Sequence, residues 1–167
     1  QRVLDDGDLN FANLECPLTV RSPKAKVLEP LHCPPKRLKY VLDAKFNLLS
    51  IANNHTLDAS GPGVVDTLRT LKAAAKSHTL WWSGAHITAA ESLKPTIVNR
   101  KGQRIAFFAI ADAHPKGGVA SVHSFTLGRR IRAAAKTNDS VIVSVHFGIE
   151  YVHVAGSDVQ KRYRGYI

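Results

Sequence analysis

The sequence has 167 residues, about the length of one domain, and its 44% hydrophobic and 22% charged residues predict a buried core and exclude a disordered chain. No apolar run approaches the roughly 20 residues that span a bilayer, and the first residues lack the layout of a signal peptide, so no segment is predicted to anchor or export the chain. The net charge of +10 favours anionic partners without selecting one.

Apolar spacing predicts the helices and strands in chain order. The expected strands cover residues 8–15, 46–52 and 140–148, with two more inside 96–112 joined at a Lys-Gly turn; the expected helices cover 34–44, 61–76 and 125–139. Leu38, Val41 and Leu42 give the first helix its period, and prolines are tolerated near its start. Because helices alternate with apolar strands, we expect an α/β layered domain.

Two features of composition leave alternatives open. Basic residues are densest in "GRRIRAAAK" and "QKRYRGY", where solvated helix faces explain them as well as a binding surface does. Cys16 and Cys33 are the only cysteines. A disulfide between them requires export, and we favour the prediction of two buried free thiols.

Polar side chains gather where three of the predicted strands end. In α/β folds such strand ends carry reactive residues. A carboxylate, an amide oxygen and an imidazole that met there would suit manganese, iron or zinc, and a neighbouring histidine could act as a general acid. Each residue also has an ordinary explanation, as a surface carboxylate, a turn or a core histidine. The residues are Asn13 and Glu15 after the first strand, Asn53, Asn54 and His55 after the second, and His146 and Glu150 after the last.

Four spaced blocks carry a resemblance over nearly the whole chain: "DLNFANLECPLT", "FNLLSIANNHTLDASGPGVVDTLRTL", "GQRIAFFAIAD" and "DSVIVSVHFGIEY". In this order they resemble the bacterial capsule-biosynthesis proteins of CapA type, the poly-γ-glutamate synthesis family. That family belongs to the calcineurin-like metallophosphoesterase superfamily. The resemblance implies a layered sandwich of the metallo-dependent phosphatase type.

The resemblance also implies roles for single residues. Glu15, Asn54 and His146 match metal-ligand positions, and His55 matches the histidine that assists the leaving group. The implied cofactor is a divalent metal: manganese, iron or zinc. Residues implied to support the ligands or face the substrate are Asn13, Asn53, Asp58 and Glu150.

The sequence departs from the family pattern in three places. No residue matches the family's early Gly-Asp motif, and no "GHHPH"-like block follows, so we expect residues 1–167 to form a single partial CapA-like domain, truncated at both ends. With an incomplete ligand set, this chain alone should bind metal weakly and catalyse poorly. Trp81 and Trp82 are unlike the family blocks; core filling is the favoured interpretation, and a lid or partner contact the alternative.

Two classes of function follow. The first is a metal-dependent hydrolase of the capsule or polyglutamate pathway, acting on an anionic polymer or a phosphate ester. The second is a non-catalytic component that binds an acidic polymer or a partner synthase, including membrane synthase subunits. The resemblance implies a cell-envelope or extracellular location. No nucleic-acid partner is expected, because no nucleic-acid-binding motif is present.

Overall fold

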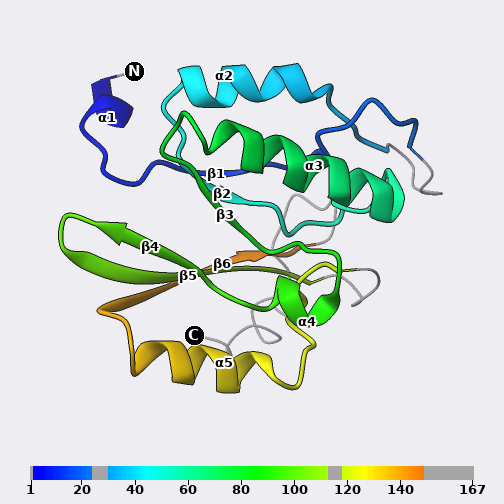
Figure 1. Ribbon diagram of the computed structural model, residues 1–167. Coiled ribbons are helices and arrows are strands. Elements are labelled where there is room, and N and C mark those ends of the chain that lie inside the picture. Colours follow the sequence, from blue (N-terminus) through cyan, green and yellow to red (C-terminus); the bar gives the residue numbers. More distant parts are fainter. Residues whose placement is uncertain (1, 24–29, 113–117, 149–167) are drawn as a thin grey trace.

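Two three-stranded sheets pack face to face in the computed structural model, which describes residues 2–23, 30–112 and 118–148 (Figure 1). In the first sheet, β1 (Phe11–Asn13), β2 (Leu48–Ser50) and β3 (Trp81–Ser83) are parallel, in the order β1-β2-β3. In the second sheet, β5 (Gln103–Ala111) lies between β4 (Thr96–Arg100), which is antiparallel to it, and β6 (Ser140–His146), which is parallel.

Helices cover the outer faces of both sheets (Figure 1). The helix α2 (Leu38–Asp43), with the 3-10 turn Pro35–Arg37 before it, and the helix α3 (Ser60–Ala74) lie on the first sheet; α5 (Leu127–Ala135) lies on the second. Two shorter helices are α1 (Arg2–Asp5) and α4 (Ala89–Ser92). The molecule is therefore layered as helix, sheet, sheet, helix, which agrees with the predicted α/β class.

Successive side chains of each strand point to opposite faces of the sheet, and they contribute to three hydrophobic cores. In β5, Phe107 and Ala109 face the first sheet, whereas Phe108 and Ile110 pack with Leu127 beneath α5. On the first sheet, the third core consists chiefly of Leu18, Leu38, Leu49, Ile51, Val64, Leu71, Leu80 and Ala85. The central strands β2 and β5 are thus buried on both faces, as expected in a layered α/β protein, whereas the edge strand β6 keeps Ile142 and Val143 exposed.

The two sheets approach closely at Gly84, immediately after β3. A Cβ atom at this position would stand 2.5 Å from the Cβ of Ala52 and 2.9 Å from the carbonyl oxygen of Ala109. The φ of Gly84 is +110°, a conformation that side chains rarely adopt. Glycine is therefore required at this contact between the sheets.

The predicted elements are present but mostly shorter than expected. The Lys-Gly turn joins β4 to β5 as predicted, with φ of 47° at Lys101 and 76° at Gly102, which suits a two-residue hairpin. The strand β3 was missed because its two tryptophans and serine show no apolar period. Its Trp81 packs into the core between the sheets and Trp82 into the core beneath α3, in agreement with the core-filling interpretation.

The prediction of free thiols was wrong, because Cys16 and Cys33 form a disulfide with their Cα atoms 5.9 Å apart. The two segments lie side by side: the N–H of Thr19 donates to the carbonyl of Cys33, and the N–H of Cys33 donates to that of Pro17. This pairing has no local sequence signal, which is why the disulfide was not predicted. Within the described ranges, no helix is long and apolar enough to cross a membrane.

Candidate metal centre

Glu15, Asn54 and His146 meet at the carboxyl ends of β1, β2 and β6. The Nε2 atom of His146 lies 2.9 Å from Oδ1 of Asn54 and 3.7 Å from Oε1 of Glu15. All three side chains are at least partly accessible to solvent. Three residues from distant parts of the sequence, on two sheets, thus form one accessible cluster.

The buried amide of Asn53 holds the loop after β2 in place. Its Nδ2 donates to Oδ1 of Asn13 (3.2 Å) and to the carbonyl of Leu14 (3.0 Å), and its Oδ1 accepts from the N–H of His55 (3.1 Å). The side chain of Asn13 in turn donates to Oε2 of Glu15, at 3.4 Å. Asn53 therefore ties the loop that carries Asn54 to the segment that carries Glu15.

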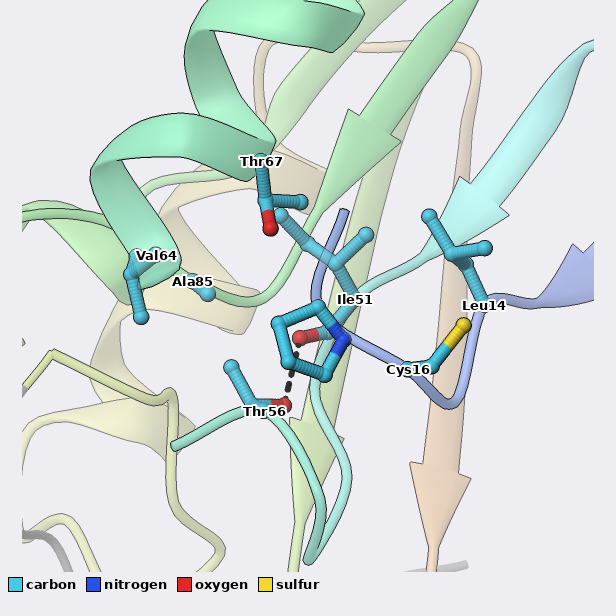
Figure 2. A pocket seen from close by; sticks show the side chains of 8 residues that line it. Leu14, Cys16, Ile51, Thr56, Val64, Thr67 and Ala85 are labelled. Carbon is cyan, nitrogen blue, oxygen red and sulfur yellow. Dashed lines mark hydrogen bonds between the residues drawn. The ribbon is translucent and has the colours of Figure 1, made fainter. Parts of the chain in front are cut away.

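The buried side chain of Thr56 stabilises the same loop through hydrogen bonds (Figure 2). Its hydroxyl donates to the carbonyl of Ile51 at 2.8 Å and accepts from the N–H of Asn53 at 3.0 Å. The cavity beside it has a volume of about 10 Å³, which is room for about one water molecule, and its lining is mostly apolar. This cavity is therefore too small to hold anything larger than a water molecule. The cavity is lined by Leu14, Cys16, Pro17, Ile51, Thr56, Val64, Thr67 and Ala85.

His55 is oriented by Asp58. Nδ1 of His55 lies 2.7 Å from Oδ2 of Asp58, and the side chains are only 12% and 2% exposed. The same carboxylate oxygen accepts from the N–H of Leu31 at 2.6 Å. Because a carboxylate accepts, the proton of the neutral ring belongs on Nδ1.

The donor atoms fit a shared divalent metal. Ligands that bind one metal at about 2.1 Å stand about 3.0–3.4 Å apart, and the two measured separations, 2.9 and 3.7 Å, lie close to this range. The carboxylate, amide oxygen and imidazole suit manganese, iron or zinc. Among the described residues no group of three His, Cys, Asp or Glu side chains that could hold a metal ion is found, and the third side chain of this cluster is an amide. Glu15, Asn54 and His146 are the residues that could hold a metal.

One predicted site residue, Glu150, lies outside the described residues. The pair Asp112 and His123 lies near the cluster but was not predicted from the sequence. Asp112 directly follows β5, where its N–H donates to the carbonyl of His146 at 2.9 Å and its Oδ1 lies 2.8 Å from Nε2 of His123. Asp112 stands at the end of a predicted strand, so the rule that selected Glu15 could have found it. His123 has no such signal.

Comparisons with known proteins match most or all of the chain. The family model described as "Bacterial capsule synthesis protein PGA_cap" matches residues 1–167. The capsule biosynthesis protein CapA of Bacillus anthracis is 29% identical over 164 residues, which cover 89% of this chain and 39% of that protein. The chain thus spans about two fifths of the relative's length. It belongs to the bacterial capsule synthesis protein family.

Proposed function

We propose that this chain carries part of a metal-dependent hydrolase site that acts in capsule synthesis on a phosphate ester or an anionic polymer. The observation that carries the proposal is the meeting of Glu15, Asn54 and His146 at one accessible point. The layered fold supports it further, since the two packed sheets between helices suit a calcineurin-like metallophosphoesterase.

In this proposal Glu15, Asn54 and His146 hold manganese, iron or zinc. When bound, the metal supplies a hydroxide nucleophile near neutral pH and polarises an oxygen of the substrate. In its doubly protonated form, His55 is held by Asp58 through Nδ1–H and donates the proton on Nε2 to the departing oxygen, returning to the neutral ring. Asn53 keeps its neighbour Asn54 in position. Asn13 does the same for Glu15. The role proposed for Glu150, as a support of the ligands or a substrate contact, rests on the family resemblance alone.

The proposed setting is the cell envelope, with membrane synthase subunits as partners. This follows from membership of the capsule synthesis family, because a capsule is assembled at the cell surface. No nucleic-acid partner is proposed.

A second candidate is a non-catalytic component that binds an acidic polymer. The net charge of +10 and the three arginines of α5 favour it. The two candidates differ in their response to conditions: pure polymer binding weakens steeply with added salt and ignores chelators, whereas a metal-dependent reaction stops when the metal is removed.

Elemental analysis tests the metal site directly. The chain and the full-length protein are loaded with manganese or zinc, dialysed and analysed alongside His146→Ala and Asn54→Ala variants of each. We expect metal to be retained best in the full-length protein and to fall in both variants. Equal metal content in the wild type and the variants would overturn the proposed ligand set. Absence of metal from all of them would favour the second candidate.

A further inference from the structure

The disulfide between Cys16 and Cys33 joins two segments that both reach the candidate metal centre. Cys16 directly follows Glu15, a proposed metal ligand. Cys33 lies two residues after Leu31, whose backbone N–H donates to Oδ2 of Asp58 at 2.6 Å. One covalent bond thus links the segment that carries a proposed ligand to the segment that contacts the partner of the proposed general acid.

The buried carboxylate of Asp58 depends on two partners for its position. Its Oδ2 atom lies 2.7 Å from Nδ1 of His55 and accepts from the N–H of Leu31. A buried carboxylate needs hydrogen bonds that replace the water it has lost, so the N–H of Leu31 helps to fix the place of this oxygen. Because Asp58 orients the ring of His55, a displacement of Leu31 would also loosen the orientation of that ring.

The backbone around Cys33 is held to the Cys16 segment by hydrogen bonds as well as by the disulfide. The N–H of Cys33 donates to the carbonyl of Pro17 at 2.9 Å, and the N–H of Thr19 donates to the carbonyl of Cys33 at 2.8 Å. Hydrogen bonds between loop segments open and close locally, whereas a disulfide keeps the segments together when they open. The disulfide is therefore the contact that keeps Leu31 beside Asp58 most firmly.

We propose that the disulfide of Cys16 with Cys33 positions His55 through Leu31 and Asp58, so that its reduction slows the proposed reaction. The effect on the rate rests on the proposed function, in which His55 is the general acid, whereas the effect on the orientation of the ring does not. In this proposal the cysteines and Leu31 are positioning residues that contact neither the metal nor the substrate.

Reduction requires a dithiol, which supplies two electrons and two protons. The bond between the two Sγ atoms breaks, Cys16 and Cys33 become thiols, and the dithiol becomes a disulfide. Leu31 then loses its covalent link to the neighbouring segment, its N–H leaves Asp58 for part of the time, and the ring of His55 adopts more than one orientation. A general acid must lie within hydrogen-bond reach of the departing group, so kcat falls while the metal ligands stay in place.

The first test follows the hydrogen bond of His55 by NMR in the full-length protein with isotope-labelled histidine. The proton on Nδ1 should give a downfield resonance, which is assigned by its loss in His55→Ala. Leu31→Pro removes the donating N–H and should weaken or shift this resonance, as should the double variant Cys16→Ala, Cys33→Ala. Leu31→Ala is the matched control, because it shortens the side chain but keeps the N–H. An unchanged resonance in the double variant, or equal changes in Leu31→Pro and Leu31→Ala, would overturn the proposal.

The second test measures kcat and KM toward a phosphate ester in the manganese-loaded full-length protein, with and without a dithiol, at a temperature at which both forms are folded. Reduction should lower kcat about tenfold and leave KM and metal content unchanged. It should have little effect on Asp58→Asn, in which the path from Leu31 to His55 is already broken. The double cysteine variant should ignore the dithiol, which shows that the dithiol does not act by removing metal.

The two tests separate this proposal from the metal site. An equal fall of kcat in the wild type and in Asp58→Asn on reduction would overturn the proposal, because the disulfide would then act through another residue. If the wild-type protein hydrolyses no phosphate ester in either redox state, the proposed function fails, and the resonance of His55 alone decides whether the disulfide positions the ring.

Discussion

Nε2 of His146, at the end of β6, lies 2.9 Å from Oδ1 of Asn54, a residue 92 positions earlier that follows β2 in the other sheet. His146 belongs to the second sheet, whereas Asn54 follows a strand of the first sheet. Their contact thus joins the carboxyl ends of the two sheets, and anything that binds both side chains stabilises this junction.

Manganese should raise the thermal stability of the protein. A ligand at about 100 times its Kd stabilises the folded state by about 2.7 kcal/mol, which corresponds to a rise in Tm of about 5–10 °C for a chain of this size. Differential scanning fluorimetry with and without manganese measures the shift. His146→Ala should abolish it, while Asn99→Ala, on the exposed end of β4, should keep it. A full shift in His146→Ala would mean that manganese binds elsewhere.

Removing the imidazole of His55 should slow catalysis without releasing metal. General acids contribute about 10²–10⁴-fold to rates, so His55→Ala in the metal-loaded full-length protein should lose activity toward a phosphate ester in that range. Asp58→Asn should lose less, about 10–100-fold, because it only disturbs the orientation of the ring. Steady-state kinetics and elemental analysis of the same samples check both effects. A parallel loss of metal and activity would instead make His55 a ligand or a structural residue.

Reduction of the disulfide should destabilise the fold. Cross-linking residues 17 apart contributes about 3 kcal/mol in the chain-entropy model, or about 6–12 °C in Tm. Thermal unfolding with and without a reductant measures this contribution. The double variant Cys16→Ala, Cys33→Ala should resemble the reduced protein and be insensitive to the reductant. An unchanged Tm of the wild-type protein after complete reduction would contradict the prediction.

Stability should depend on pH through Asp66. The Thr19 hydroxyl that donates to Asp66 lowers the pKa of this carboxyl, burial opposes the shift, and Arg21 adds to it. The folded pKa therefore lies below the unfolded value of about 3.9, so the stabilisation is complete above that value and disappears as pH falls through the folded pKa. Asp66→Asn should lower the free energy of unfolding by about 1 kcal/mol near neutral pH and by less at acid pH. Urea unfolding at both pH values measures the two losses of unfolding free energy. Equal losses would mean that the shape of the Asp66 side chain, and not its charge, causes the effect.

Local patterns in the sequence predicted most of the fold. Apolar residues that recur at the helical period located α3 and α5, and continuous short apolar runs located β2, β5 and β6. The three-residue strand β3 escaped because two tryptophans and a serine show no period.

The candidate site was only partly visible for a related reason. Polar residues after strands can be found along the chain, which is how Glu15, Asn54 and His146 were selected. Contacts between distant segments leave no such local trace. The disulfide of Cys16 with Cys33, and the bond from Leu31 to Asp58 that helps to orient His55, depend on which segments become neighbours in space.

The close approach of the sheets at Gly84 has a consequence for the choice of ion. Glu15 and Asn54 lie with the first sheet and His146 with the second, so the separation of the sheets sets the distance between donor atoms. That separation is fixed at Ala52, Gly84 and Ala109, where the smallest residues touch. The ionic radius that the proposed centre would prefer is therefore set partly by residues that contact no ion, and a methyl group added at Gly84 would push the sheets apart and change the distances between Glu15, Asn54 and His146 without replacing any of them.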